Sequence, residues 1–180
     1  MSDLTNNNSS AKRFAVVGLG PVGLILAAHL KEAGCDVALC DFDKVKINLI
    51  RKEGIKLEGA IQKQNAYENI FTSIAELRDY NPDIVFVSIK GYQTPAFVEQ
   101  VMKLNFGDTI FISAQNGIDV EEIFASGITE NKTMRMVINF AGNLTAPHIV
   151  KVTFFNPPNH LSSLDDSKLE IAKQISETLN

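Results

Sequence analysis

The amino-acid sequence predicts an α/β fold in which a mostly parallel β-sheet carries helices on both faces. Apolar runs of strand length alternate with stretches of helical periodicity, which is the pattern of repeated strand–helix–strand units. A glycine-rich turn at residues 18–23 follows the first apolar run and precedes an apolar helical stretch. Residues 84–89 are almost continuously apolar, which is typical of a strand covered on both faces, so we expect them near the middle of the sheet.

The same patterns place the elements in order along the chain. Strands are predicted at residues 13–18, 37–41, 55–57, 84–89, 109–113 and 134–140, and residues 148–155 are a candidate for one more. Helices are predicted at residues 21–33, 44–52, 94–104, 120–126 and 165–179. The Asn-Pro-Pro-Asn segment at residues 156–159 is expected to break regular structure.

Length and charge indicate one domain and limit its partners. The chain has 180 residues, of which 45% are hydrophobic, and we expect a disordered polar tail at residues 1–11 before a domain at residues 12–180. The net charge is −4 and no basic cluster is interleaved with aromatic residues, which argues against a nucleic-acid partner. We expect no membrane association and a cytoplasmic location, because no apolar run approaches ~20 residues and no signal peptide is evident.

The cysteines and histidines indicate neither a redox site nor a metal site. Cys35 and Cys40 lack Cys-x-x-Cys spacing, so we expect free thiols. No carboxylate stands near His29, His148 or His160 at a spacing that suggests a catalytic dyad, so structural or surface roles are expected.

Residues 14–23 carry most of the functional argument, because an apolar strand there runs into a Gly-x-Gly-x-x-Gly turn. In a dinucleotide-binding fold, the first glycine permits the tight turn, the second lets the backbone approach a pyrophosphate, and the third lets the helix pack on the strand. The sequence therefore predicts a Rossmann-type, doubly wound domain. The expected pyrophosphate-binding residues are Gly18, Leu19, Gly20, Pro21, Val22 and Gly23. In an α/β domain without a ligand, these glycines would serve only the geometry of the turn.

An acidic residue, Asp41, follows the second predicted strand at the place where this fold holds the adenosine ribose. A carboxylate there accepts hydrogen bonds from a free 2′-hydroxyl and repels a 2′-phosphate, so Asp41 favours NAD over NADP. Lys44 would restore NADP binding only if its side chain turned back over the ribose.

Three further segments follow predicted strands at the carboxyl edge of the sheet, where ligands of open α/β sheets bind. Lys90 follows one strand, Asn116 follows the next, and residues 139–142 follow a third. Lysine and asparagine side chains can donate hydrogen bonds to cofactor or substrate oxygens. The alternatives are a solvated surface charge for Lys90 and a turn dipeptide for Asn116 with its following glycine.

Three segments together resemble the N-terminal domain of ketopantoate reductases (2-dehydropantoate 2-reductases). They are Ala-Val-Val-Gly-Leu-Gly-Pro-Val-Gly at 15–23, Ser-Ile-Lys-Gly-Tyr-Gln-Thr at 88–94 and Ser-Ala-Gln-Asn-Gly-Ile at 113–118. The resemblance implies an oxidoreductase that uses NADPH to reduce 2-dehydropantoate to pantoate, on the route to pantothenate and coenzyme A. It also implies that Lys90 and Asn116 contact the cofactor and border the 2-oxo acid substrate, and that Ala141 lines the cofactor site through its backbone.

Two departures from the family pattern change these expectations. The family usually carries a basic residue just after the second strand, where this chain has Asp41. The family's C-terminal helical domain, with its proton-donor lysine, lies beyond Asn180, so we assign no catalytic residue and expect weak or no turnover from this chain alone. Apolar surface that faced this domain would be exposed, so self-association into a homo-oligomer is expected.

Two other functions stay open. The chain could be the first domain of a different NAD(P)-dependent dehydrogenase, acting on a 2-hydroxy acid or a sugar nucleotide. It could also be a nucleotide-binding module without catalysis.

Overall fold

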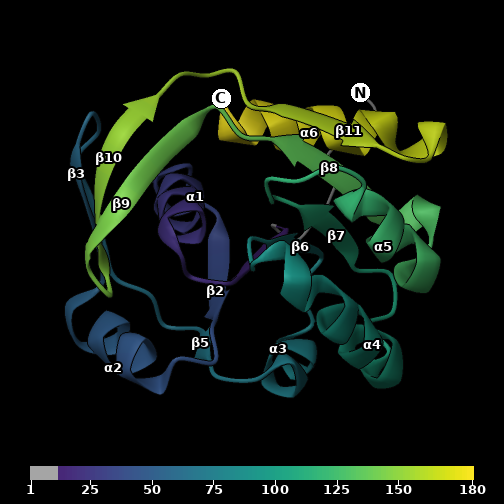
Figure 1. Ribbon diagram of the computed structural model, residues 1–180, viewed down its shortest axis with the longest axis horizontal. Helices are drawn as coiled ribbons and strands as arrows, with labels where there is room; N and C mark the ends of the chain where they lie inside the picture. Colours follow the sequence, from purple (N-terminus) through teal and green to yellow (C-terminus); the bar gives the residue numbers. More distant parts are fainter. Residues whose placement is uncertain (1–11) are drawn as a thin grey trace, which may run out of the picture.

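The computed structural model describes residues 12–180, so the expectation for residues 1–11 lies outside the described residues (Figure 1). Its larger sheet has seven strands in the order β11-β8-β7-β6-β1-β2-β5, and all neighbours pair in parallel except β11 with β8. The strands are β1 (Arg13–Val17), β2 (Asp36–Cys40), β5 (Ile70–Phe71), β6 (Ile84–Val87), β7 (Ile110–Ser113), β8 (Thr133–Val137) and β11 (His160–Ser163). The prediction of a central strand from residue 84 is confirmed, although β6 ends at Val87 rather than at residue 89.

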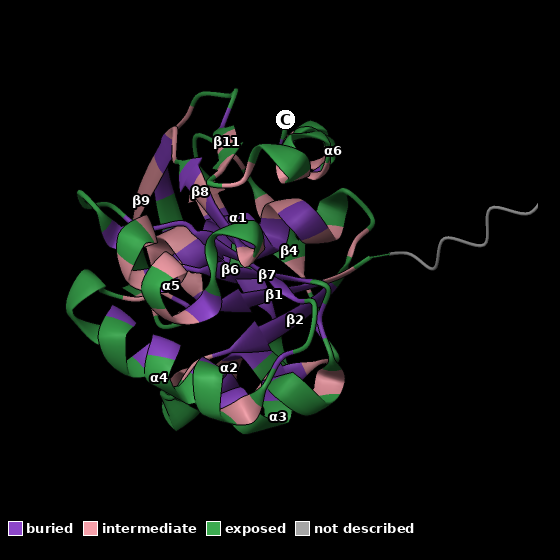
Figure 2. Ribbon diagram, turned by 90° about the vertical axis from the view of Figure 1, so that its right-hand side faces the viewer, coloured by how far each residue is buried: buried purple, intermediate pink, exposed green. Residues whose placement is uncertain are grey.

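Helices cover both faces of this sheet, as the sequence predicts. They are α1 (Pro21–Glu32), α2 (Lys44–Glu53), α3 (Ile74–Tyr80), α4 (Thr94–Leu104), α5 (Val120–Ile128) and α6 (Leu169–Leu179). Alternate side chains of β1 enter two separate cores, because Phe14 and Val16 join α1 and α6 on one face while Ala15 and Val17 join α3, α4 and α5 on the other. The central strands are buried and the outer faces of the helices are exposed (Figure 2). The fold is a doubly wound α/β domain.

A second, four-stranded sheet with the order β4-β3-β10-β9 covers the side of α1 that faces away from the larger sheet (Figure 1). Its strands are β3 (Ile55–Gly59), β4 (Lys63–Asn65), β9 (Phe140–Ala146) and β10 (Ile149–Phe155). The ring of Phe155 stacks on Phe140 at 5.6 Å between centroids and lies 4.9 Å from the ring of His29 in α1. Helix α1 is therefore buried between two sheets.

Several predicted boundaries are wrong, and the differences have physical reasons. The single strand expected at 134–140 is two strands, because β8 ends at Val137 in one sheet and β9 begins at Phe140 in the other. The last helix begins at Leu169 rather than 165, after a short 3₁₀ turn (Asp166–Lys168) in which the Asp165 side chain accepts from the Ser167 N–H at 2.9 Å. Helix α3 was not predicted, although Ser73 and Glu76 form a complete capping box at its start.

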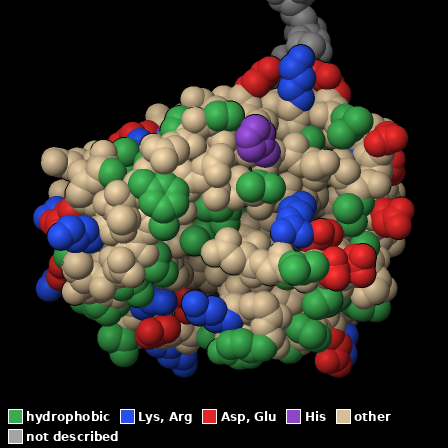
Figure 3. All heavy atoms as spheres, turned by 45° about the horizontal axis from the view of Figure 1, so that its top comes forward, with side chains coloured by type: hydrophobic (Ala, Val, Ile, Leu, Met, Phe, Trp, Pro, Cys, Tyr) green, Lys and Arg blue, Asp and Glu red, His purple; other side chains and the backbone are tan. Residues whose placement is uncertain are grey.

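Surface charges are mixed in sign. On the face in Figure 3, Lys and Arg side chains are interspersed with Asp and Glu. Among the described residues, no helix has the length and apolar character needed to cross a bilayer.

Candidate functional site

The glycine turn between β1 and α1 is held by its surroundings. Gly18 has φ +86° and its N–H donates to the Cys40 carbonyl at 2.9 Å, while a side chain there would strike Ile89 of the loop after β6. A Cβ at Gly23 would collide with the Gly18 carbonyl oxygen and the Ser88 hydroxyl. These two glycines therefore meet the requirements that the sequence motif predicts for turn and packing.

Gly20 differs from the other two, because no protein atom lies within 4 Å of the position its Cβ would occupy. It adopts φ −72° at the N-cap of α1, a conformation open to any residue, and no side chain caps the helix N-terminus there. The start of α1 thus presents uncapped backbone N–H groups beside open space, and Pro21 occupies the first turn without needing a hydrogen-bond partner. This arrangement fits an anion that approaches the backbone closely.

The turn is joined to the loop after β6 by Ser88. Its hydroxyl lies 2.6 Å from the Gly18 carbonyl oxygen and 3.3 Å from that of Val17, and it donates to these carbonyls. The turn and the loop that begins with Lys90 are thereby held in one position relative to each other.

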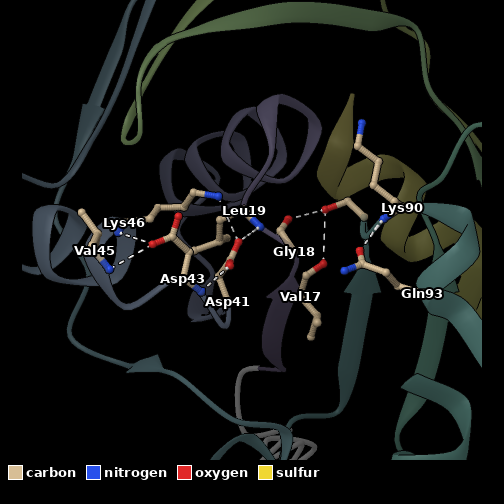
Figure 4. A network of polar contacts seen from close by, with 10 residues as sticks. Val17, Gly18, Leu19, Asp41, Asp43, Val45, Lys46, Lys90 and Gln93 are labelled. Carbon is tan, nitrogen blue, oxygen red and sulfur yellow. Dashed lines mark hydrogen bonds and ion pairs between the residues drawn. The ribbon is translucent and has the colours of Figure 1, made fainter. Parts of the chain in front are cut away.

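Asp41 follows β2 beside the turn, as predicted, but its carboxylate is already engaged. Its Oδ2 accepts from the Leu19 N–H at 2.7 Å and lies 3.2 Å from the Lys46 ammonium, and its Oδ1 accepts from the Asp43 N–H at 2.9 Å. The lysine that reaches Asp41 is Lys46, in the first turn of α2, whereas the sequence argument considered Lys44. Figure 4 shows the Lys46 side chain extending toward Asp41.

Lys90 lies at the rim of the same site. It is exposed and opens a short 3₁₀ turn (Gly91–Gln93), in which the Gln93 side chain accepts from the Lys90 N–H at 3.2 Å. Its side chain extends away from Gln93 (Figure 4), and within residues 12–180 no carboxylate pairs with it. A cation is thus available at the carboxyl edge of the sheet.

The loop after β7 contributes a buried amide that the sequence argument missed. Gln115 is 7% exposed, and its Nε2 donates to the Ile89 carbonyl at 2.8 Å and to the Thr94 hydroxyl at 3.0 Å. Asn116, which the sequence argument singled out, is exposed instead. Gln115 could have been found from its position two residues after β7 (Ile110–Ser113), because ligands of open α/β sheets bind at the carboxyl ends of the strands.

Ala141 is not in a loop, contrary to expectation. It lies in β9 opposite Phe154 of β10, because the chain crosses to the second sheet directly after β8. It does not line the pocket at the glycine turn, so its contact with a cofactor stays a prediction.

The glycine turn, Asp41 and Lys90 border one pocket of about 190 Å³ at the carboxyl edge of the larger sheet. Its lining includes the glycine turn, the residues after β2 and the residues after β6: Val17, Gly18, Leu19, Gly20, Cys40, Asp41, Phe42, Lys46, Ser88, Ile89, Lys90 and Gln93. Burial, with the Asp41 charge beside it, raises the pKa of the Cys40 thiol to about 12, so Cys40 is a neutral apolar wall rather than a nucleophile. The pocket combines backbone N–H donors, one ion pair and one lysine, a donor set suited to phosphate groups.

The cysteines form no disulfide with each other, and the three histidines have different surroundings. Both thiols are free. His29 packs on Phe155, His148 is buried with Nε2 3.2 Å from Glu53, and His160 is exposed.

Comparison with known proteins bears on this site. The model of the family "Ketopantoate reductase PanE/ApbA" matches residues 14–165. The 2-dehydropantoate 2-reductase of Aquifex aeolicus is 28% identical over 141 residues, which are 78% of this chain and 43% of that protein. The enzyme of the same name from Streptococcus pyogenes serotype M3 is 22% identical over 170 residues, covering 92% of this chain and 52% of that one. The chain therefore spans about half the length of these curated relatives.

Solved structures show the same fold at lower identity. A D-mandelate dehydrogenase with NADH and anilino(oxo)acetate superposes with a TM-score of 0.79 at 21% identity, covering 93% of this chain and 53% of that one. A 2-dehydropantoate 2-reductase from Geobacter metallireducens gives 0.76 at 21% identity, covering 93% and 55%. Because the family model spans the glycine turn, the Lys90 loop and the Asn116 loop, we conclude that this chain belongs to the ketopantoate reductase PanE/ApbA family.

Proposed function

We propose that this chain is the cofactor-binding domain of a reductase that uses NADH or NADPH to convert 2-dehydropantoate to pantoate, in pantothenate and coenzyme A synthesis. The observation that carries the proposal is Gly20. The protein itself leaves the Cβ position of Gly20 open at an uncapped helix N-terminus, so the space next to it suits a pyrophosphate. Family membership and the dehydrogenase neighbours support a nicotinamide cofactor.

In this proposal the described residues bind and orient, and the bound cofactor supplies the hydride. The backbone from Gly18 to Gly23 holds the pyrophosphate. Lys90 and Asn116 border the cofactor and the 2-oxo acid, and the Lys90 ammonium balances negative charge there. We assign no proton donor within residues 12–180, and general acid catalysis is worth ~10²- to 10⁴-fold. We therefore propose that this chain alone turns over weakly or not at all.

A second candidate substrate is another 2-oxo acid. The structural neighbour with a TM-score of 0.79 is a D-mandelate dehydrogenase, which shares the chemistry of hydride transfer at a carbon next to a carboxylate. Assays of a longer protein that contains this domain, with 2-dehydropantoate and aromatic 2-oxo acids in parallel, decide between the two. A nucleotide-binding module without catalysis would reduce neither.

Gly20→Ala tests the proposed site directly. The methyl group meets no protein atom, so we expect the free energy of unfolding to change by less than about 1 kcal/mol. The same methyl group fills the space reserved for the pyrophosphate, so the dissociation constant for NADH or NADPH should rise about tenfold or more, equivalent to about 1.4 kcal/mol. Titration followed by nicotinamide fluorescence measures the affinity.

Gly23→Ala is the matched contrast, since its methyl group collides with the turn itself and should destabilise the fold. If Gly20→Ala binds both cofactors as tightly as the unchanged chain, the pyrophosphate does not bind next to Gly20. If the unchanged chain binds neither cofactor, the proposed function is wrong.

We also propose that the chain associates with a second copy of itself through the edge that carries the site. Tyr92 and Ile118 there are 83% and 89% exposed, and large exposed apolar side chains promote association. Light scattering across a concentration series should show a rising mass, and a Tyr92→Ser, Ile118→Ser double variant should remain monomeric. A constant monomer mass for the unchanged chain would contradict this.

A further inference from the structure

The Asp41 carboxylate has little capacity left for a ribose. Each carboxylate oxygen offers two lone pairs. Oδ2 uses both, for the Leu19 N–H at 2.7 Å and the Lys46 ammonium at 3.2 Å, and Oδ1 uses one for the Asp43 N–H at 2.9 Å. One lone pair remains, whereas a carboxylate that selects NAD accepts hydrogen bonds from the ribose hydroxyls.

The charge at this point is balanced rather than negative. The Lys46 and Asp41 side chains are only 13% and 15% exposed, so water screens the pair weakly. The repulsion that a lone Asp41 would exert on a phosphate is therefore cancelled by the ammonium beside it. The other nearby carboxylate, Asp43, is engaged with the Val45 and Lys46 N–H groups at 3.0 and 3.1 Å.

We propose that Lys46 determines the cofactor specificity of this chain by neutralising Asp41 and by donating a hydrogen bond to the 2′-phosphate of NADPH. This inference rests on the proposed function, because it assumes that the adenosine ribose lies beside Asp41. Both residues line the same pocket as Gly18 and Gly20, so the ammonium stands where the fold places the ribose. Asp41 keeps its two backbone donors when Lys46 contacts a phosphate. The chain therefore accepts NADPH at least as well as NADH.

Lys44 provides the matched control. It carries the same charge on the same helix, two residues earlier, but it is exposed and pairs with no carboxylate in the described part of the chain. Residues two apart on a helix do not share a face. If net charge alone sets the affinity for NADPH, Lys44→Met and Lys46→Met should weaken NADPH binding equally.

The experiment measures dissociation constants for NADPH and NADH with the unchanged chain, Lys46→Met, Lys46→Arg and Lys44→Met. Lys46→Met should weaken NADPH binding about tenfold or more, as expected for loss of a charge-assisted hydrogen bond, and change NADH binding less than about threefold. Lys46→Arg should keep the NADPH affinity. Lys44→Met should leave the ratio of the NADPH and NADH dissociation constants unchanged. Competition by adenosine 2′,5′-bisphosphate and by ADP isolates the 2′-phosphate, and only the former should weaken in Lys46→Met.

The outcomes separate the two proposals. Absence of binding by the unchanged chain to either cofactor overturns the proposed function. Binding of both cofactors with the same NADPH-to-NADH ratio in Lys46→Met and in the unchanged chain overturns the role of Lys46 alone. If Lys46→Met fails to fold, competition by adenosine 2′,5′-bisphosphate and ADP is measured with Lys46→Gln instead. If adenosine 2′,5′-bisphosphate competes as strongly in Lys46→Gln as in the unchanged chain, the proposal is contradicted.

Discussion

Gln115, in the loop after β7, is bonded to the loop after β6, which lines one side of the pocket. Its amide nitrogen reaches the Ile89 carbonyl and the Thr94 hydroxyl, and its oxygen accepts from the Ser113 hydroxyl at 3.2 Å. Lys90 directly follows one of these partners. The side chain therefore positions the lysine from a neighbouring strand, without itself lining the pocket.

Gln115→Met tests this role, because methionine has a similar shape but cannot donate. The half-buried Ile89 carbonyl and the buried Thr94 hydroxyl lose a donor, so we expect the free energy of unfolding to fall by about 1–3 kcal/mol in urea titrations. Asn116→Ala, at an exposed neighbour, should change it by less than about 0.5 kcal/mol. Equal effects of the two substitutions would contradict a positioning role.

Sequence reasoning located the positions at this edge better than their contacts. The sequence located Asp41, Lys90 and Asn116 beyond strand ends, because the end of a buried apolar run indicates where a strand ends. The engagement of Asp41 by Lys46 depends on where the first turn of α2 lies relative to the end of β2, and the orientation of Gln115 depends on its bond to the loop after another strand. Local pattern carries neither kind of information.

At the level of single elements, α3 begins with a capping box that is sensitive to pH. Hydrogen bonds from the Thr72 N–H and the Ser73 hydroxyl hold the pKa of the Glu76 carboxyl below its ordinary value. A depressed pKa means that Glu76 stabilises the fold above the ordinary glutamate pKa, about 4.3, and that this contribution is lost as the pH falls through the lowered pKa.

Glu76→Gln should therefore lower the melting temperature at neutral pH and flatten its dependence on pH below about 5. Thermal unfolding at several pH values measures this. Glu68→Gln, a substitution at an exposed glutamate outside α3, should leave the slope unchanged. A slope unaltered by Glu76→Gln would show that the capping box carries no pH-dependent stability.

Sequence patterns predicted strands at residues 55–57 and 148–155, but not that these strands belong to a second sheet. Strand β4 is three residues of polar sequence, Lys-Gln-Asn, and offers no apolar alternation. Strand β3 pairs in parallel with β10, about ninety positions later, so the pairing that joins the β3–β4 and β9–β10 hairpins into one sheet is not local in sequence. Strands β1, β2, β6, β7 and β8 of the larger sheet were predicted because buried parallel strands are continuously apolar, whereas the two-residue β5 and the antiparallel edge strand β11 were not.

At the scale of the whole molecule, α1, whose N-terminus borders the pocket, is enclosed by both sheets. Residues of α1, the larger sheet and the second sheet belong to one apolar core, which includes Leu24, Val16 and Phe140. The position of the α1 N-terminus, and with it the Gly20 space, therefore depends on packing from both sides. We expect the domain to unfold as one cooperative unit.

Phe140→Ala tests this coupling. Phe140 is 4% exposed and stacks on Phe155, so its truncation should cost about 3–5 kcal/mol while urea unfolding stays a single transition. Phe154→Ala removes the same ring from the same sheet at a side chain that is 42% exposed, and should cost less than about 1 kcal/mol. Because α1 loses packing support in Phe140→Ala, the affinity of this variant for the cofactor should fall together with its free energy of unfolding. A separate early transition that leaves cofactor binding intact would show that the second sheet folds independently of the site.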